Sequence, residues 1–540
     1  MFTQSLEPVG NLWSTVLVAF IPLVVLLVLL AGLRMTAWLA TLIAGLITAT
    51  LGVLVWHAPI DLMGRAYLYG GLQGVWAIDW ITFWGLMIFN TLVFTGDFEY
   101  FKNWVIHHAT TDVRIQTLML AWAFGALLEG LVGFGYPWAV VAPILIGLGV
   151  ADLDAIRVAA LANNAPVSYG ALGTPIIALA AVTGLPLMAL SASVGHIVAV
   201  LALLPPWVLL YLVSGAEGVK EGWPLAIVGS LSYIAGQWPV ARFLGPYLPD
   251  ITGALTSFWV LFVFTKVWRP KTVRAFGGFA AAQSLGAQSA KEISASDSGH
   301  IKAALRAWMP YVVLILIVLA WTGPWSQLPN YSLLKLSVGG ISSVTGKAFA
   351  STFNLNPLSG GTAILASWLV ILMLLRPGFG AIAEVFRRTF HQMWGALLVG
   401  FFIFGLAFAF VFSGMANSMA YGCSKVGLAF IVLAPILGWV GVALSGSNTS
   451  TNTMFGPVQA VTGRLLNLPP LFLPSFNSVG AEVGKPIAPQ TASVGVSTSR
   501  YVRSEGAVIR HNMSWTLVVL AYLVLLTLVF YYFLPGVMEV

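Results

Sequence analysis

The chain has few charged residues. Asp, Glu, Lys and Arg make up 8% of its 540 positions, while hydrophobic residues make up 59%. A soluble globular domain carries roughly 25% charged residues, because its surface must face water. A chain so poor in charge cannot cover a water-facing surface of this size, so lipid must be the solvent over most of its length.

Cysteine is almost absent, since Cys423 is the one cysteine, and this excludes an internal disulfide. The seven histidines are scattered, and no HExxH, CxxC or CxxCH motif occurs. This weighs against a metal site, an attached haem or another cofactor. No nucleophile with its base stands out, so we expect no enzymatic activity. The net charge of +7 comes without a basic helix or interleaved aromatics, so we expect no nucleic-acid partner.

A removable signal peptide is also missing, because no basic segment or clear cleavage site precedes Leu12. The chain instead holds many apolar runs of about 20 residues, the length that spans a bilayer as a helix. They are too long and too uniformly apolar for β-barrel strands. We predict an all-α polytopic membrane protein with twelve to fourteen transmembrane helices, in the bacterial inner membrane. Clear runs lie near 12–31, 36–56, 74–95, 187–213, 306–322, 358–375, 391–413, 426–444 and 513–534, and weaker ones near 114–128, 155–180, 223–245 and 250–267.

Lysine and arginine concentrate in one stretch, residues 266–305, whose middle is rich in small and polar residues. Cytoplasmic loops of membrane proteins carry excess Lys and Arg. We therefore predict a cytoplasmic linker at 266–305 between an N-terminal transmembrane half, 1–265, and a C-terminal half, 306–540. The same rule predicts a long external loop at 325–357 and places both chain termini outside.

Two polar segments interrupt the apolar pattern at corresponding places in the two halves. They cover residues 127–176 and 438–491. In each segment, a short stretch rich in glycine or hydroxyl groups interrupts an apolar helix. The apolar pattern then continues through a proline, and an asparagine and a Gly-x-Pro sequence follow. This shared order predicts two inverted repeats with broken helices and re-entrant hairpins. The simpler alternative is a pair of ordinary kinks or surface loops.

Broken helices matter in a membrane because glycine and proline interrupt helical hydrogen bonds and lipid offers no replacement. Such backbone survives only inside protein or beside a water-filled cavity. Half-helix N-termini expose free N–H groups and a positive dipole end, which attract anions. Interrupted hydrophobic segments in matching places are the sequence signature of a carrier's binding site. We therefore predict a secondary carrier of small organic anions.

At these segments the chain closely resembles the L-lactate permease family. The resemblance runs from end to end and is strongest at LEGLVGFGYPWA (128–139), ILIGLGV (144–150), NNAPVSYGALGTPI (163–176), GSNTSTN (446–452) and VGKPIAPQTASVGV (483–496). It implies a symporter that takes up L-lactate, glycolate or a related 2-hydroxymonocarboxylate with protons. It also implies an ion-transporter-superfamily fold in which the Ser447–Asn448–Thr449 tip helps bind a carboxylate or a cation.

The match has two departures. The family usually has an acid where Asn448 stands and a small residue where Tyr136 stands. The first change removes a potential proton or cation carrier, and the second narrows the pocket or adds a hydroxyl donor. A sodium-coupled carboxylate transporter of the same superfamily therefore stays open as the alternative function. An anion channel and a homodimeric assembly are also left open.

Two charged residues lie within these motifs. Glu129 sits in an apolar helix, where an acid costs about 2.5–3.5 kcal/mol on insertion scales. We expect it to carry the coupled proton, because burial favours the neutral form of a carboxyl. The alternative is a helix-end acid satisfied by a cation. We expect Lys485 to pair with the substrate carboxylate, or with Glu129 or Glu482 when the site is empty. The alternative for Lys485 is a lysine that snorkels to the interface.

The other predicted substrate-binding residues flank the same breaks. Short polar side chains supply hydroxyl and amide contacts for a hydroxy acid, and glycines let backbone approach a ligand. The alternatives are a hydroxyl-rich surface loop and glycines that serve helix packing. These residues are Gly133, Phe134, Gly135, Tyr136, Asn163, Asn164, Ser447, Asn448, Thr449, Ser450 and Asn477.

Overall fold

The computed structural model describes residues 2–108, 110–133, 135–279, 297–497, 499–501 and 504–538. Phe134 lies outside the described residues, as does 280–296, the middle of the predicted linker.

The apolar runs of the N-terminal half form helices, the one structure that satisfies every backbone polar group within a single segment in lipid. Short π-helical or 3₁₀ turns, labelled η, interrupt them. The elements are α1 (Leu12–Leu27), η1 (Val28–Gly32), α2 (Ala37–Leu54), α3 (Ile60–Gly74), η2 (Val75–Asp79), α4 (Trp80–Thr95), α5 (Asp97–His108), α6 (Val113–Gln116), η3 (Thr117–Phe124), α7 (Gly125–Leu131), α8 (Tyr136–Gly147), α9 (Asp152–Ala162), η4 (Val167–Tyr169), α10 (Gly170–Thr183), α11 (Leu187–Leu201), α12 (Pro205–Phe243), α13 (Pro249–Val267), β1 (Arg274–Ala275) and β2 (Gly278–Phe279).

The C-terminal half is helical in the same way, with one β-hairpin between its first and second helices. Its elements are α15 (Asp297–Thr322), η5 (Leu328–Asn330), β3 (Leu334–Ile341), β4 (Ala348–Leu355), α16 (Gly360–Leu375), α17 (Phe379–Ser413), α18 (Met415–Ser424), η6 (Gly427–Ala429), α19 (Phe430–Ser445), α20 (Asn448–Leu465), α21 (Phe472–Gly484), η7 (Lys485–Ile487), α22 (Pro489–Val496), α23 (Glu505–Phe533) and η8 (Pro535–Met538).

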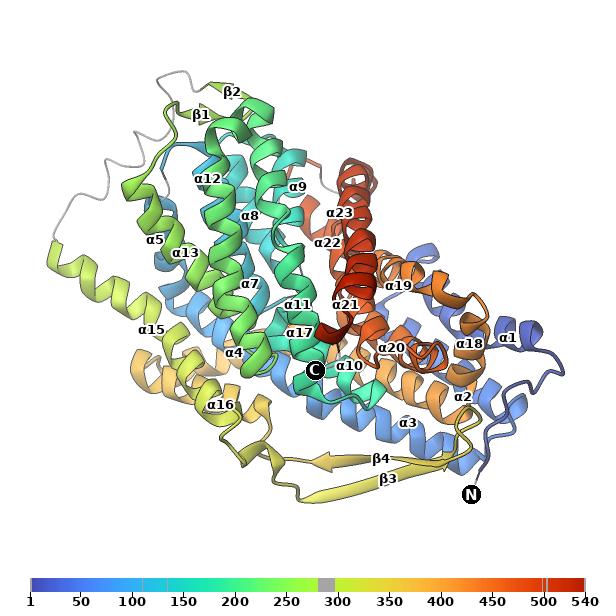
Figure 1. Cartoon of the computed structure of the whole chain (residues 1–540). Coiled ribbons are helices and arrows are strands. Elements are labelled where there is room, and N and C mark those ends of the chain that lie inside the picture. The colour runs from blue at the N-terminus through green and yellow to red at the C-terminus, as the bar shows by residue number, and fades with distance from the viewer. Residues whose placement is uncertain are drawn as a thin grey trace.

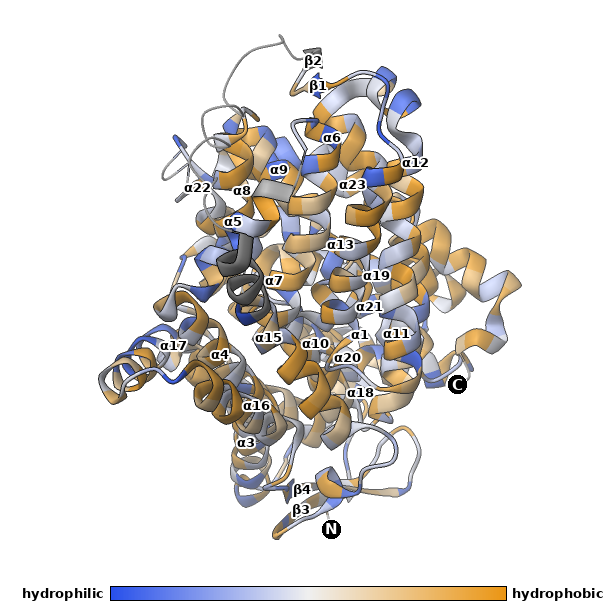
Figure 2. Cartoon of the chain, turned by 90° about the vertical axis from the view of Figure 1, so that its left-hand side faces the viewer, coloured by the Kyte–Doolittle hydropathy of each residue, from blue (hydrophilic) through white to orange (hydrophobic). Residues whose placement is uncertain are grey.

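Among the described residues, eight helical segments are long and apolar enough to cross a membrane. A bent helix pair and three shorter apolar helices, at 136–147, 306–322 and 360–375, are further candidates. Figure 2 shows hydrophobic residues along most helices and hydrophilic residues at the end of α12 that lies near β1. The helical, multi-span membrane fold is confirmed, and the predicted count of twelve to fourteen depends on the short and broken helices.

The two short sheets lie at opposite ends of the molecule (Figure 1). β1 and β2 follow α13 and belong to the region predicted as the linker. β3 and β4 pair antiparallel from Leu334–Leu355 to Ile341–Ala348. The predicted external loop thus contains a β-hairpin. A parallel bridge between Thr3 and Ile341 brings the N-terminus beside this hairpin, on the side expected for an external N-terminus.

A buried arginine holds the start of the predicted linker against the helices. Arg114 is fully buried and pairs with Asp112 at 2.6 Å and with Glu221 of α12 at 3.1 Å. It also donates to the Thr272 carbonyl, and Arg274 of β1 binds Glu221 at 3.0 Å. Each buried guanidinium therefore has a carboxylate partner, as a buried charge requires.

The two polar segments follow the same order of elements in the two halves. In the first, α7 and α8 are separated by a short break, and α9 leads through the 3₁₀ turn η4 into α10. In the second, α19 and α20 are separated by a break at 446–447, and α21 leads through the 3₁₀ turn η7 into α22. The axes on either side of η4 differ by 65°. The predicted breaks are confirmed as helix interruptions, whereas the inverted relation of the halves stays a prediction.

Candidate functional site

The two polar segments, 127–176 and 438–491, are both broken helices. A cavity of about 600 Å³ lies between these two broken segments and a wall made by α2, η2, α4 and α17. Its size is within the range of small-molecule binding pockets. The first broken segment contributes Glu129 and Gly133, and the second contributes Lys485 and residues 445–450. The peptide breaks predicted from sequence, more than three hundred positions apart, therefore meet at one cavity inside the protein.

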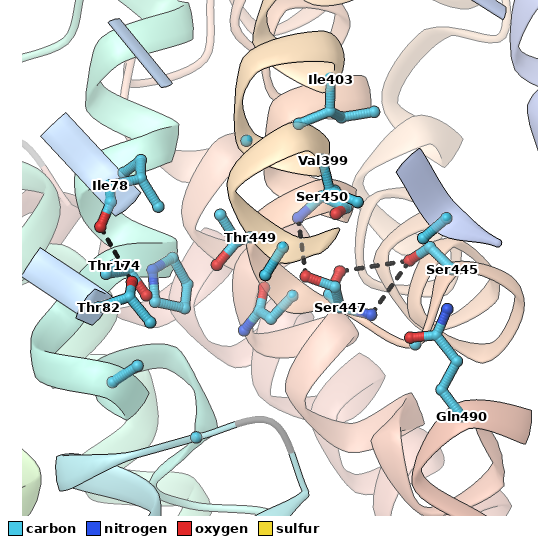
Figure 3. Close-up of a pocket in the computed structure, with 18 of the residues that line it drawn as sticks. Ile78, Thr82, Thr174, Val399, Ile403, Ser445, Ser447, Thr449, Ser450 and Gln490 are labelled. Atoms are coloured by element: carbon cyan, nitrogen blue, oxygen red, sulfur yellow. Dashed lines mark hydrogen bonds between the residues drawn. The ribbon is translucent and has the colours of Figure 1, made fainter. Parts of the chain in front are cut away.

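The tip of the second segment is a helix N-terminus that points into this cavity. Gly446 has a φ of 75°, the left-handed conformation that glycine adopts without strain, and it ends α19. Ser447 then caps α20, its hydroxyl accepting a hydrogen bond from the Ser450 backbone N–H at 3.2 Å. Figure 3 shows Ser445, Ser447, Thr449 and Ser450 gathered at this tip, with Gln490 beside them. A free helix N-terminus with adjacent hydroxyls is suited to bind an anion.

An ion pair joins the two broken segments across the cavity wall. Lys485 Nζ lies 2.5 Å from Glu129 Oε1, and both side chains are buried. Asn163 Nδ2 donates to the other Glu129 oxygen at 2.9 Å. Gly170 leaves room for the carboxylate, since a Cβ there would come within 2.6 Å of Glu129 Oε1. Glu129 is thus the partner of Lys485 here, one of those predicted for it, and the role of the pair in transport stays a prediction.

The first segment approaches the cavity through unusual backbone. Gly133 has a φ of 68° at the break after α7. At the start of α10, Ala171, Leu172 and Gly173 have φ values of 46°, 59° and 80°. Left-handed conformations at residues with a Cβ cost of the order of 1–3 kcal/mol each and gather at binding sites. Ala171 and Thr174, on either side of this kink, both line the cavity.

The predicted site residues fall into two groups. Gly133, Ser447, Asn448, Thr449, Ser450, Lys485 and Glu129 line the cavity. Gly135, Tyr136, Asn163, Asn164 and Asn477 are not among its lining residues. Tyr136 packs edge-on against Phe89, with ring centroids 4.6 Å apart. Gly135 lies against Thr491 of α22, and a Cβ there would reach the threonine methyl at 2.7 Å. The binding role of every one of these residues stays a prediction.

Behind the cavity, a hydrogen-bonded network holds the two segments together. Asn477 donates to Asn452 at 3.0 Å, and Asn452 donates to Ser478 Oγ at 3.0 Å and to the Pro175 carbonyl at 3.1 Å. Asn448 donates to the Ser478 carbonyl at 3.2 Å. Asn477 therefore positions α20 from behind and does not face the cavity.

Sequence reasoning missed two acids near the site, Asp79 and Asp250, and named a third, Glu482, only as a possible partner of Lys485. Asp79 of η2 lines the cavity, and it was detectable as a lone acid inside the apolar run 74–95. Glu482 is fully buried and accepts a hydrogen bond from Ser168 Oγ at 2.5 Å, a contact between α21 and η4. Asp250 of α13 is buried and accepts from the Tyr233 hydroxyl at 3.0 Å.

Ion pairs also connect the two segments away from the cavity. Arg500, in the loop after α22, binds Asp152 at the start of α9, with 3.1 Å between Nη2 and Oδ1. Hydrogen bonds to this carboxylate raise the pKa of Arg500 above its usual value. His511 of α23 lies 2.9 Å from Asp154 of α9. These contacts link α9 to the region around α22.

The sequence matches the L-lactate permease family over residues 15–534. It is 34% identical to the glycolate permease GlcA of Escherichia coli K12, and the alignment covers 99% of both chains. It is 32% identical to the L-lactate permease of Bacillus subtilis, over 97% of this chain and 98% of that protein. It is 30% identical to the L-lactate permease of Escherichia coli K12, over 96% of both.

Two solved structures are similar at low identity. The YdaH transporter of Alcanivorax borkumensis has a TM-score of 0.43 and 15% identity, covering 88% of this chain and 87% of that one. MtrF of Neisseria gonorrhoeae, described as an antimetabolite efflux pump, has a TM-score of 0.46 and 13% identity, covering 92% of this chain and 94% of that one.

The family match spans nearly the whole chain, and the curated relatives are named permeases. The apolar helices are those of a multi-pass protein of the bacterial inner membrane. The chain therefore belongs to the L-lactate permease family.

Proposed function

We propose that this protein takes up L-lactate, glycolate or a closely related 2-hydroxymonocarboxylate together with a proton. The observation that carries the proposal is the buried Lys485–Glu129 pair beside the N-terminus of α20 in one cavity. The relatives, an L-lactate permease and a glycolate permease, support the substrate class.

The substrate carboxylate binds between Lys485 and the tip of the second segment. Lys485 supplies a buried ammonium, and α20 supplies N–H groups at its positive end. The hydroxyl groups of Ser447 and Thr449 lie at the same tip and donate to carboxylate oxygens. A monoanion fits this set because Lys485 is the one cation among the described residues that line the cavity.

Proton coupling follows from the charge balance at Glu129. In the empty site Lys485 and Glu129 neutralise each other. When a substrate carboxylate pairs with Lys485, Glu129 keeps the hydrogen bond from Asn163 but no longer pairs with the Lys485 ammonium. A buried carboxylate without a counter-ion costs several kcal/mol, so Glu129 takes a proton. The site is then neutral in both states, and one proton has entered with one anion.

Glu129→Gln tests this coupling. Glutamine mimics the protonated acid and cannot release a proton. In proteoliposomes we expect the variant to exchange labelled L-lactate or glycolate across the membrane while losing accumulation driven by an imposed pH gradient. Glu384→Gln is a matched control, since Glu384 pairs with Arg387 and Arg388 away from the cavity. Unchanged accumulation in Glu129→Gln would clear Glu129 of the coupling role.

Sodium coupling is the second candidate, favoured by one observation. Asn448 Oδ1 is buried at the hairpin tip and accepts no hydrogen bond within the described part of the chain, so this oxygen is free for a cation. The described residues contain no group of three His, Cys, Asp or Glu side chains that would hold a metal ion. Imposing a sodium gradient without a pH gradient separates the two. Uptake driven by sodium alone would overturn the proton scheme.

A further inference from the structure

Asp79 is a buried acid on the cavity wall opposite the hairpin tip. It is the last residue of the π-helical turn η2, is 5% exposed and lines the cavity. Its Oδ2 is buried and has no hydrogen-bond partner among the described residues. Single π-helical turns are frequent at functional sites. An unsatisfied carboxyl that borders a cavity is a group awaiting a ligand.

No cation reaches this carboxyl from the described parts of the elements packed around it. The helices α4 and α10 contain no titratable side chain. The charged residues of α3, Asp61 and Arg65, pair with each other at 2.6 Å and are exposed. On α17, Glu384 pairs with Arg387 and Arg388, and His391 is exposed. Lys485, on the other side of the cavity, is engaged by Glu129.

The neighbouring helix is shaped to accommodate Asp79. Gly400 of α17 packs directly on it, and a Cβ at that position would overlap both carboxyl oxygens. Beside Asp79, the Thr82 hydroxyl donates to the Ile78 carbonyl at 2.9 Å, so its proton is already used. Figure 3 shows Ile78 and Thr82 across the cavity from Ser445, Ser447 and Gln490. The other cavity-lining residues of α17 near Gly400 are apolar: Val399, Ile403 and Phe404.

The charge state of Asp79 follows from this environment. An ionised carboxylate without a cation or a donor is far costlier to bury than a neutral acid, so Asp79 holds a proton. A neutral carboxyl offers one O–H donor and one carbonyl acceptor. An alcohol hydroxyl is also both donor and acceptor, and so complements it. The 2-hydroxyl group of the proposed substrate lies one carbon from the carboxylate that Lys485 holds.

The geometry points to Asp79, in its protonated form, as the residue that recognises the substrate's 2-hydroxyl group and so selects 2-hydroxy acids over simple carboxylates. This inference rests on the proposed function. Its proton stays on Asp79 in the empty and the loaded carrier, so it adds nothing to the coupling at Glu129. Sites built to hydrogen-bond a substrate hydroxyl reject analogues that lack it, because their own polar groups are then left unpaired.

The test is a competition assay with the purified full-length protein in lipid nanodiscs. Bound labelled L-lactate is displaced by unlabelled L-lactate or propionate, and by glycolate or acetate, pairs that differ by one hydroxyl group. We expect the wild type to prefer the hydroxy acid in each pair. Asp79→Leu should lower that preference roughly tenfold or more, while Asp79→Asn, which keeps a donor and an acceptor, should retain most of it.

Controls keep the outcomes separable. Asp61→Leu changes an exposed acid of the preceding helix and should leave the preference unchanged. If Asp79→Leu fails to fold, Gly400→Ala displaces the carboxyl and should also lower the preference. Gly380→Ala, on the same helix but not among the cavity-lining residues, has open space around the added methyl group and should not. An unaltered preference in Asp79→Leu, or an equal loss of affinity for both members of each pair, overturns the inference. A wild type that binds neither L-lactate nor glycolate would instead overturn the proposed function.

Discussion

Lys485 and Glu129 are 356 positions apart in the chain. Burying either charge within the membrane without the other would cost free energy. The structure makes them partners at 2.5 Å and adds Asn163 as a third member. This arrangement differs from a structural ion pair in one respect, because it borders a cavity in which an anion can compete for the lysine. In the proposed mechanism, the pair switches between two neutral states as the substrate binds and leaves.

Lys485→Ala is expected to remove substrate binding while the protein still reaches the membrane. Removing one partner of a buried, hydrogen-bonded charge pair costs about 2–5 kcal/mol, which corresponds to a loss of affinity of roughly 30-fold to several thousand-fold. Equilibrium binding of labelled L-lactate or glycolate to the purified variant measures this loss. Lys425→Ala is the control, since Lys425 lies over the Tyr421 ring outside the cavity. Wild-type affinity in Lys485→Ala would take the lysine out of the site.

At the scale of elements, the hairpin tip depends on very close helix packing behind it. α19 and α21 touch through glycines, and a Cβ on Gly480 would overlap the Pro435 carbonyl, while one on Gly438 would overlap the Asn477 carbonyl. Small residues let membrane helices approach in this way. The contact fixes α19, which ends at Gly446, and thereby sets the position of the α20 N-terminus.

Gly480→Ala is expected to destabilise the protein, because its methyl group must push α21 away from α19. Overpacking of this kind costs typically about 1–3 kcal/mol. The thermal unfolding midpoint of the purified protein should fall, and uptake should fall with it. Gly380→Ala, on α17 with nothing within 4 Å of the added Cβ, should leave the midpoint equal or slightly higher. Equal midpoints for the two variants would contradict the packing argument.

At the scale of the whole molecule, the cavity lies between the broken segments and the wall of α2, η2, α4 and α17. Polar contacts hold the broken segments together, including the Asn452 and Glu482 hydrogen bonds and the Asp152–Arg500 pair. We infer that the two broken segments move together, as one unit, against the opposite wall during alternating access. In the proposed mechanism, Lys485 and Glu129 carry no net charge when they pair with each other, nor when an anion and a proton are bound.

Uptake should therefore be insensitive to membrane potential. A charge moved across 100 mV gains or loses about 2.3 kcal/mol, so any uncompensated charge would be visible. Initial rates of L-lactate or glycolate uptake into proteoliposomes, at a fixed pH gradient and with potassium diffusion potentials of either sign, should agree within error. Faster uptake at an inside-negative potential would mean that more than one cation accompanies each anion, contrary to the proposed charge balance.

Several features of the fold and the site were predictable because they are local. The breaks near Gly133 and Ser447 follow from glycine, proline and hydroxyl residues inside apolar runs, and the pairing of Lys485 with Glu129 follows from the cost of leaving either charge alone. The strands β3 and β4 were not expected, although β3 alternates apolar and polar residues from Leu334 to Val338, because residues 325–357 were interpreted only as an external loop between apolar helices. Tyr136 was assigned to the pocket by its neighbours in sequence, yet its ring turns to Phe89.

The sequence by itself determined that this protein is embedded in lipid, that two polar segments interrupt its apolar helices, and which charged residues lie in those segments. Each of these follows from the solvation of a short stretch of chain. Tertiary structure alone decided which side chains face one cavity. Asp79 lies in the apolar run 74–95, and Asn477 lies in the second polar segment, so both stand out as polar residues in the sequence. In the structure, Asp79 lines the cavity, whereas Asn477 supports α20 from behind. The reason is that the direction of a side chain depends on how distant helices pack, and that packing is a property of the whole chain.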